Sequence, residues 1–434
     1  MRKFTRDIPI SIYPPIFYYN SSYNTNVWEK INDKRKNLYI HIPFCPQKCK
    51  FCYFTSYGFD LDLVERYVCV LCDELKFITQ KSCQKPKIDN IYIGGGTPTL
   101  LPLEMLEKIF TTINTYYSVS EDAEITVEVR PGNEVNKNKL EYLKKAGVNR
   151  ISTGVQSFSS DILRLNGRNN NIDDVYRLLS LINETEFNCL NIDIMSGMLG
   201  ENKTSWNYTI EKLLEILPEN ITLYKMQLYA NSLLYGDSKK HKIEIMSEDR
   251  ELHMAKFMYM KLIENGYCLD DSTYSFKLKK YIKNNSYRKS RNMGTEIIAV
   301  GVSANGYVND YVYQNSNSIE DYLHESSGSH ISSSYKLCDE EKFYREIILN
   351  LKSGQIDRKE IMKKYYCDPY YKFKEKIDEL VKMNLVELSH NKIVVINEGI
   401  LFIDDIIRRY FMQDFIRTKE AMLLKFKNFK FREV

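Results

Sequence analysis

Strand and helix patterns alternate along the middle of the chain, and this alternation constrains the fold more than any other feature. Short runs rich in β-branched residues, such as 125–129, predict parallel strands that are buried on both faces. Strand and helix units of roughly 35 residues imply right-handed parallel crossovers. We expect an α/β fold, an incomplete (β/α)6 barrel, with strands at 38–43, 89–94, 124–130, 150–156, 189–195 and 221–228 and helices at 61–79, 103–116, 137–145, 172–182 and 205–216.

Three cysteines, Cys45, Cys49 and Cys52, follow the first expected strand at spacings of four and three residues. A loop of this kind turns three thiolates toward one point, and thiolate is the usual ligand of iron–sulfur clusters. Three thiolates bind three irons of a [4Fe–4S] cube and leave the fourth iron open for chemistry. Two other interpretations are buried reduced cysteines and a zinc site, which would need paired C-x-x-C motifs and a fourth ligand.

Polar and glycine residues stand where the expected strands end, and that end carries the chemistry in such barrels. The second strand runs into a glycine-rich turn, 94–99, where missing Cβ atoms let a ligand touch the backbone, although a tight turn explains it too. Glu128 and Asp193 are carboxylates within apolar strands, so each needs a partner such as a ligand hydroxyl or a buried cation. Gln156 ends the fourth strand, and Arg168 beyond it is suited to bind a carboxylate.

The spacing C-x-x-x-C-x-x-C is typical of the radical S-adenosylmethionine (SAM) superfamily, and this chain resembles it closely. The chain is similar in particular to the oxygen-independent coproporphyrinogen III oxidases (dehydrogenases) and their relatives. The resemblance implies that an electron from the cluster cleaves SAM to a 5′-deoxyadenosyl radical. The segments that carry the resemblance are 39–45, 91–99, 154–158, 191–193, 301–304 and 313–315.

The resemblance also implies cofactor contacts, residue by residue, and no catalytic residue beyond them. Cys45, Cys49 and Cys52 would hold the [4Fe–4S] cluster, whose open iron would bind the amino and carboxylate groups of SAM. One or two SAM molecules would bind beside the cluster. The contacts would be Tyr39, Gly95 and Glu128 for the first SAM, Phe51, Gly96, Thr97, Gln156, Arg168 and Asp193 for the second, and Ala304 and Asn305 for the adenosine.

One position departs from the pattern of the dehydrogenases. Those enzymes have a further cysteine two residues after the third, and Phe54 stands at that position here. The Cys-x-Phe form is similar instead to haem chaperones and to two-SAM methyltransferases and cyclopropane-forming enzymes. Three functions therefore remain open: coproporphyrinogen-type oxidation in porphyrin metabolism, which the overall resemblance favours, methyl transfer or cyclopropanation, and haem binding and transfer.

The sequence suggests three parts. Residues 1–36 show little periodicity and predict an extended arm, whereas 37–325 would form the barrel and an irregular extension. The Ser/Gly-rich segment 326–334 predicts a linker. Residues 335–434 predict a small C-terminal domain of helices and one hairpin, similar to a winged helix and to the C-terminal domain of the coproporphyrinogen oxidase family.

Charge and hydropathy exclude several kinds of partner. The net charge of +4 over 434 residues is small, and the C-terminal domain lacks a basic recognition face, so we expect no nucleic-acid partner. The sequence predicts no signal peptide and no membrane span, and hence a cytoplasmic location with reduced cysteines. Basic runs at 239–242 and 281–291 predict either contacts with substrate carboxylates or a solvated surface. The expected partners are a small-molecule substrate, with a tetrapyrrole as the leading candidate, and a reducing electron donor such as flavodoxin or ferredoxin.

Overall fold

One large mixed sheet forms the centre of the molecule. The computed structural model describes residues 4, 6, 13–20, 26–29, 31–82, 84–168, 172–270, 272–281, 286–325 and 328–412. Among them, no helix is both long enough and apolar enough to cross a membrane. The strand order is β12-β11-β10-β9-β1-β2-β3-β4-β5-β6-β8-β7, so the sheet has two free edges in the described part of the chain and does not close into a barrel.

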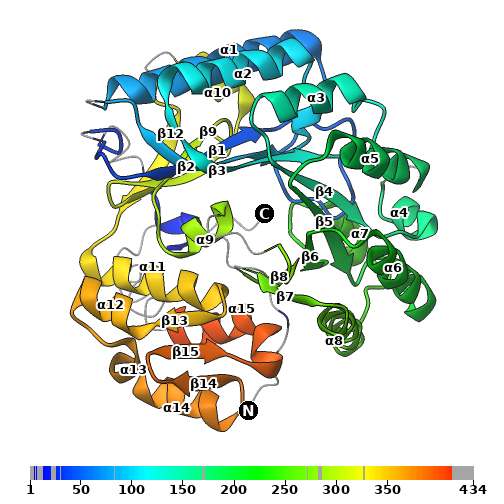
Figure 1. Ribbon diagram of the computed structural model, residues 1–434, viewed down its shortest axis with the longest axis vertical. Coiled ribbons are helices and arrows are strands. Elements are labelled where there is room, and N and C mark those ends of the chain that lie inside the picture. Colours follow the sequence, from blue (N-terminus) through cyan, green and yellow to red (C-terminus); the bar gives the residue numbers. More distant parts are fainter. Residues whose placement is uncertain are drawn as a thin grey trace.

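The six expected strands are neighbours in the sheet and run parallel, which confirms the predicted α/β architecture. Helices between the strands cover one side of the sheet, along the top and right of Figure 1. The strands are β1 (Lys36–Ile42), β2 (Lys87–Gly95), β3 (Ser118–Val129), β4 (Arg150–Gln156), β5 (Cys189–Ser196) and β6 (Asn220–Lys225), and the helices are α1 (Leu61–Gln80), α2 (Leu103–Tyr116), α3 (Lys137–Lys145), α4 (Ser160–Leu165), α5 (Ile172–Thr185) and α6 (Lys203–Ile216).

The two faces of these parallel strands differ in character. In β1, Leu38, Ile40 and Ile42 are fully buried in the large hydrophobic cluster that includes α1 and α2. Tyr39 and His41 alternate with them and therefore point to the concave side of the sheet. The prediction that these strands are buried on both faces is confirmed for β1, in which Tyr39 is half-buried and every other residue is buried, although the side chains on the concave face are polar. By the same alternation, the side chains that the other strands place on the concave side include Tyr92, Glu128, Arg150, Ser152, Asn191, Asp193, Thr222 and Tyr224.

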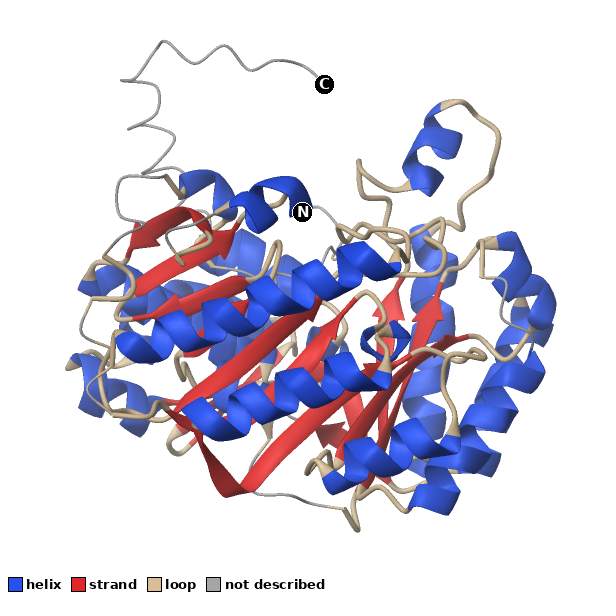
Figure 2. Cartoon of the chain, turned by 90° about the horizontal axis from the view of Figure 1, so that it is seen from above, coloured by secondary structure: helices blue, strands red, loops and turns tan. Residues whose placement is uncertain are grey.

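Strands beyond the parallel core extend the sheet at both ends, seen from above in Figure 2. The segment expected to be irregular contains α7 (Leu233–Lys239), α8 (Glu248–Glu264), the hairpin of β7 (Tyr267–Asp270) with β8 (Ser272–Leu278), and α9 (Tyr287–Asn292). At the other end lie β9 (Ile297–Val300), β10 (Asn305–Val308), β11 (Tyr311–Asn315), α10 (Ile319–His324) and β12 (Ile331–Lys336). The linker prediction was therefore wrong for 331–334, which pair with β11.

The C-terminal elements lie across the concave side, at the lower left of Figure 1. Their three-stranded sheet has the order β13-β15-β14. Their hydrophobic core lies around Phe343, Ile347 and Ile377 and also includes Tyr13 and Leu252 of α8. The elements are α11 (Asp339–Lys352), β13 (Gln355–Asp357), α12 (Arg358–Tyr365), α13 (Pro369–Lys372), α14 (Lys374–Lys382), β14 (Val386–Ser389), β15 (Lys392–Val395), α15 (Ile403–Ile406) and a π-helix (Ile407–Met412).

Described residues before β1 hold distant parts of the fold together. The ring of Phe4 stacks on Phe402 of the C-terminal part, with ring centroids 5.9 Å apart. The guanidinium of Arg6 donates a hydrogen bond of 2.9 Å to the hydroxyl of Ser196, at the end of β5, and forms a buried ion pair with Glu251 of α8. These two residues therefore connect the C-terminal part to the barrel.

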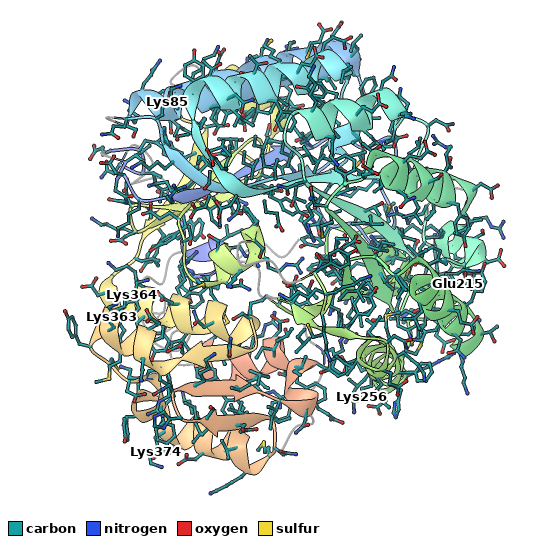
Figure 3. All side chains as sticks on the ribbon, in the orientation of Figure 1. Lys85, Glu215, Lys256, Lys363, Lys364 and Lys374 are labelled. Carbon is teal, nitrogen blue, oxygen red and sulfur yellow. The ribbon has the colours of Figure 1, made fainter. Side chains whose placement is uncertain are left out.

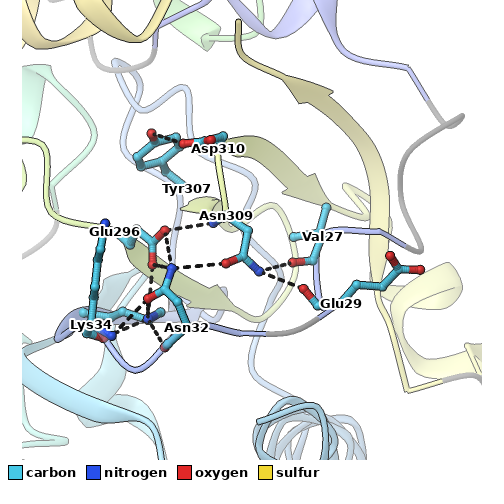
Figure 4. Close-up of polar contacts among 9 residues, drawn as sticks. Val27, Glu29, Asn32, Lys34, Glu296, Tyr307, Asn309 and Asp310 are labelled. Atoms are coloured by element: carbon cyan, nitrogen blue, oxygen red, sulfur yellow. Dashed lines mark hydrogen bonds and ion pairs between the residues drawn. The ribbon is translucent and has the colours of Figure 1, made fainter. Parts of the chain in front are cut away.

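A second set of polar contacts fixes the chain just before β1 (Figure 4). The amide of Asn32 donates to the carboxylate of Glu296 at 3.1 Å. The amide of Asn309 donates to the carbonyl oxygens of Val27 at 3.3 Å and Glu29 at 3.1 Å. The segment from 26 to 36 is thereby attached to the strands beside β1.

Charged side chains lie at the periphery of both parts (Figure 3). Lys85, Glu215 and Lys374 point outward from the barrel and the C-terminal elements in this view. Basic and acidic groups alternate over these surfaces and several form exposed ion pairs, such as that of Lys374 with Asp378. The outer surface therefore has mixed charge, in keeping with the small net charge.

Candidate functional site

The three cysteines lie on one short loop at the carboxyl end of β1. The backbone N–H of Cys45 donates to the carbonyl of Tyr57 at 2.9 Å, and the N–H of Tyr57 donates to Pro43 at 2.8 Å, which closes the base of the loop. Within the loop, the N–H of Cys52 donates to the carbonyl of Cys49 at 3.1 Å. All three cysteines are partly buried and free of disulfides.

The surroundings of the thiols are mixed in polarity. The Cys45 thiol lies 3.7 Å from the hydroxyl of Thr97, and Arg168 Nη1 donates to Cys49 Sγ at 3.7 Å. Burial raises the pKa of Cys45 and raises that of Cys52 to about 11, and the charges of neighbouring cysteines add to both shifts. In the part of the chain that the structure describes, no three His, Cys, Asp or Glu side chains converge closely enough to hold a single metal ion.

The glycine-rich turn after β2 packs directly against the cysteine loop. The N–H groups of Gly96 and Thr97 donate to the carbonyls of Ile42 and Phe44, both at 2.7 Å. A Cβ atom on Gly96 would lie 2.5 Å from the carbonyl oxygen of Phe44, so only glycine fits there. These two N–H donors are thus used within the chain, and the close packing accounts for Gly96 without a ligand.

Glu128 faces the concave side and has partners from its own chain. Its carboxylate accepts hydrogen bonds from the Tyr92 hydroxyl at 2.6 Å and from the N–H of Gly95 at 2.9 Å. Burial raises the pKa of this carboxyl group, and the two hydrogen bonds act in the opposite direction. The sequence left a ligand hydroxyl or a buried cation as possible partners of Glu128. Its hydrogen-bond donors in the structure are instead a phenol and a backbone amide.

Tyr39 and His41 form a hydrogen-bonded pair next to this carboxylate. The Tyr39 hydroxyl lies 2.8 Å from His41 Nδ1, and the rings of Tyr39 and Tyr92 stack with centroids 6.2 Å apart. Burial lowers the pKa of His41 to about 4, so its imidazole is neutral at pH 7. Because a Cβ on Gly95 would lie 2.4 Å from this ring, the glycine also makes room for His41.

Gln156 and Arg168 lie at the end of β4. Gln156 has a positive φ of 72° although it is not glycine, and its side-chain oxygen is buried without a hydrogen-bond partner. Arg168 is buried, its guanidinium donates to the carbonyl of Gly154, and its Nε has no partner. Backbone strain together with unpartnered buried atoms is typical of ligand sites.

Asp193 forms a hydrogen bond within its own strand, β5. Its carboxylate accepts a hydrogen bond of 2.8 Å from the amide of Asn191, which also donates to Ser152 at 2.9 Å. Burial raises the pKa of Asp193, and the bond from Asn191 opposes that shift. The structure therefore gives Asp193 an amide partner, and its role as a contact of the second SAM stays a prediction.

The segment after β9 lies beside the cysteine loop because β9 pairs in parallel with β1. Ala304 is buried, and the side-chain oxygen of Asn305 is buried without a partner. The N–H of Gly301 donates to the carboxylate of Glu74 at 2.9 Å, and the amide of Asn315 donates to the same group at 2.7 Å. Glu74 thus connects α1 to this segment.

Sequence reasoning missed Glu74, although the signal was present. The residue stands on the apolar face of α1, with Leu71 and Leu75 on the same buried side. A carboxylate at such a position requires hydrogen-bond donors from elsewhere in the fold. Glu74 therefore marks a site at which another segment docks.

Phe51 packs against a small apolar cluster of Leu199, Met226 and Leu234. The next aromatic residues form a stack: Tyr53 lies between Phe54 and Tyr229, with ring centroids 4.2 and 3.9 Å away. Phe54, which replaces the additional cysteine of the dehydrogenases, is 45% exposed. The structure therefore places an exposed aromatic stack beside Cys52.

Comparison with known proteins agrees with this geometry. The Radical SAM superfamily matches residues 39–213, which include the cysteine loop and the parallel strands to α6. Proteins of this superfamily use a [4Fe–4S] cluster and SAM. In overall fold the chain matches coproporphyrinogen III oxidase (HemN) from Escherichia coli with a TM-score of 0.79 and 21% identity, over 92% of this chain and 96% of that one.

Similar sequences carry two kinds of name. The heme chaperone HemW of Bacillus subtilis is 26% identical over 371 residues, which are 84% of this chain and 96% of that protein. The oxygen-independent coproporphyrinogen III oxidase of Salmonella typhimurium is 23% identical over 388 residues, which are 85% of this chain and 84% of that protein. The chain therefore carries a radical SAM domain and is a homologue of both the HemW heme chaperones and the oxygen-independent coproporphyrinogen III oxidases.

Proposed function

We propose that this protein is a radical SAM enzyme of the coproporphyrinogen oxidase type, in which Cys45, Cys49 and Cys52 hold a [4Fe–4S] cluster. The observation that carries the proposal is the position of these cysteines, on one loop at the mouth of a polar concave face. Three thiolate ligands leave one iron open for SAM.

The residues around the loop fit a cluster with thiolate ligands. Arg168 donates to the sulfur of Cys49, and the positive charge of Arg130 favours the thiolate of Cys45. Nearby cations stabilise thiolates, which are the form that binds iron. This arrangement offsets part of the burial that raises the thiol pKa values.

The polar atoms around the loop also fit a polar organic cofactor. The side-chain oxygens of Gln156 and Asn305 and the Nε of Arg168 are buried and lack partners within the chain. A bound SAM offers an amino group, a carboxylate and ribose hydroxyls, which would supply both donors and acceptors. We therefore propose Gln156, Arg168 and Asn305 as the SAM contacts with the strongest support.

A cluster bound here would supply one electron to the sulfonium of SAM, which breaks a carbon–sulfur bond and gives methionine and a 5′-deoxyadenosyl radical. The chain's part is to position SAM and exclude water. The hydrogen bond between Tyr39 and His41 fixes both side chains at the site, and the neutral imidazole of His41 adds no charge there. Glu128, with its two donors, keeps the turn after β2 fixed against β3.

A tetrapyrrole is the proposed substrate because the relatives named above oxidise coproporphyrinogen III or serve as heme chaperones. In the oxidase reaction, hydrogen is removed from a propionate side chain, which then loses CO2 and becomes a vinyl group. The electron remaining on the substrate requires an acceptor, and the cluster requires a reducing donor such as flavodoxin or ferredoxin.

A haem chaperone is the second candidate function. Two observations favour it: the similarity extends over 96% of the length of HemW from Bacillus subtilis, and Phe54 replaces the additional cysteine of the dehydrogenases. A chaperone would bind haem in a fixed ratio and cleave SAM poorly. An oxidase would cleave SAM in proportion to the CO2 it releases.

The test is anaerobic reconstitution with iron and sulfide, followed by SAM and dithionite and by chromatography of the nucleosides. We expect 5′-deoxyadenosine from the wild type and none from Cys49→Ala. The matched control is Cys69→Ala, which removes an exposed cysteine of α1 and should retain the activity. S-Adenosylhomocysteine among the products would instead indicate a methyltransferase, and tight haem binding without SAM cleavage would indicate a chaperone.

A further inference from the structure

Three cationic side chains from different elements gather around one tyrosine on the open side of the barrel. Tyr274 belongs to β8, Arg288 and Arg291 belong to α9, and Lys352 is the last residue of α11. In Figure 1, α9 lies in the middle of the molecule, between the large sheet and the C-terminal elements. These cations thus come from both sides of the space between the barrel and the C-terminal part.

The contacts to Tyr274 are direct. The guanidinium of Arg288 lies 5.8 Å from the centre of the Tyr274 ring, and the ammonium of Lys352 lies 5.5 Å from it. Burial alone would raise the pKa of the Tyr274 phenol, but the positive charges of Lys352, Arg291 and Arg288 outweigh burial and lower this pKa to about 8. The positive charge is therefore concentrated at this ring.

The positive charge is only partly balanced by acidic groups. Lys352 forms an ion pair of 3.3 Å with Asp404, which is the acidic group beside the Tyr274 phenol. Arg288 also lies in the field of Asp193 and Asp270, yet in the described part of the chain neither Arg288 nor Arg291 forms an ion pair within 4.0 Å. Arg288 Nη1 and Arg291 Nε are inaccessible to solvent and have no hydrogen-bond partner.

Unpartnered guanidinium atoms at such a position require an anionic partner. A buried hydrogen-bond donor without an acceptor is costly, and arginine binds carboxylates through two parallel hydrogen bonds. Tyr274 also borders a cavity of about 40 Å³, which Tyr224 of β6 and Asp404 of the C-terminal part line as well. The described part of the chain therefore offers unpartnered guanidinium donors and lacks their acceptor.

We propose that Arg288, Arg291 and Lys352 form, around Tyr274, a subsite that binds a carboxylate of the substrate between the barrel and the C-terminal part. This inference rests on the proposed function in one respect only, which is that the substrate enters the concave side. It also gives a role to the basic run at 281–291, whose residues Arg288 and Arg291 face inward. A carboxylate bound here would connect α9 to α11 and so hold the C-terminal part over the barrel.

The test is a fluorescence titration of the full chain with coproporphyrin III, which carries four propionates, and with its tetramethyl ester, which has the same ring and no carboxylates. We expect Arg288→Gln to weaken binding of the acid about 10-fold or more, since it removes a charge-assisted hydrogen bond, and to leave binding of the ester unchanged. Lys289→Gln is the matched control, because it removes the same charge from the same helix, and should change the affinity less than about twofold.

A second variant distinguishes the loss of the binding contact from misfolding. Arg288→Lys keeps the charge and should recover part of the affinity, and the melting temperature of each variant reports whether it folds. Equal binding of acid and ester by the wild type, no binding of the acid, or full affinity in Arg288→Gln would each overturn the subsite. If the wild type binds the acid through Arg288 but does not cleave SAM, the proposed enzymatic function is refuted and the proposed subsite is still supported.

Discussion

The two faces of the parallel strands show how one sequence encodes both a core and a binding surface. On the outer face, Ile40 and Ile93 are fully buried and make only apolar contacts in the large hydrophobic cluster. On the concave face, Tyr39, Glu128 and Asp193 make hydrogen bonds within a polar layer. The outer face should therefore control stability and the concave face should control ligand binding, and each prediction below tests that separation.

The largest effect on stability should come from the outer face. Ile40→Ala leaves a cavity in a fully buried position and should lower the free energy of unfolding by about 3 kcal/mol. The matched concave-face variant, Tyr39→Phe, removes only the hydroxyl that bonds His41 and should cost about 1 kcal/mol. Urea denaturation of both variants measures the difference. Equal losses in the free energy of unfolding would show that the two faces do not differ in their contribution to stability.

Lowering the pH should destabilise the protein through His41 on the concave face. Burial lowers the pKa of His41 to about 4, from about 6.5 in an unfolded chain, so between these values the unfolded chain binds a proton that the folded chain rejects. The stability due to the neutral imidazole is complete above pH 6.5 and falls with pH, by about 2 kcal/mol at pH 5.

The measurement is the free energy of unfolding of the wild type and of His41→Gln at pH 7 and pH 5. The wild type should lose about 2 kcal/mol more than the variant on acidification, because glutamine does not titrate. A parallel fall in the two proteins would mean that the histidine is not sealed from solvent.

A smaller effect should come from the contact between the two loops at the mouth of the barrel. Gly96→Ala places a Cβ 2.5 Å from the Phe44 carbonyl and should cost about 1.5 kcal/mol by overpacking, while displacing the cysteine loop. Iron bound per chain after reconstitution should fall together with the melting temperature. Gly58→Ala is the control, since nothing lies within 4 Å of the added atom, and iron loss in that variant would refute the explanation.

The smallest effect belongs to the surface of the outer helices. Arg164 and Asp161 of α4 form an ion pair whose side chains are 76% and 78% exposed. Arg164→Ala should change the free energy of unfolding by less than about 0.5 kcal/mol and leave the iron content unchanged. A larger loss would show that the outer surface contributes more than its exposed charges suggest.

Much of the parallel core could be predicted from local pattern. The helices expected at 103–116 and 137–145 have those bounds in the structure, because amphipathic spacing marks the residues that face the sheet. The cysteine motif and the carboxylates within strands also identified the mouth of the barrel. These signals are local, and a single segment of the chain is enough to show them.

Features that depend on distant contacts could not be predicted in this way. The hairpin of β7 and β8 pairs with β6, so its position is decided by a strand edge and not by its own sequence. The positive φ of Gln156 and the partners of Glu74 likewise follow from packing between segments far apart in the chain. The partners of Glu128 on the concave face belong to another strand, β2, so the sequence of its own strand does not identify them.

The contacts of Phe4 and Arg6 affect how the protein reaches its native state. Phe4 precedes the barrel strands in the chain, and its stacking partner Phe402 follows them, so Phe402 is synthesised after the whole barrel. The stacking of Phe4 on Phe402 therefore cannot form while the barrel is still being translated, even when the parallel strands have already paired. This contact between the two ends of the fold is thus made late in assembly, and Phe4→Ala should impair the last step of assembly and not the first.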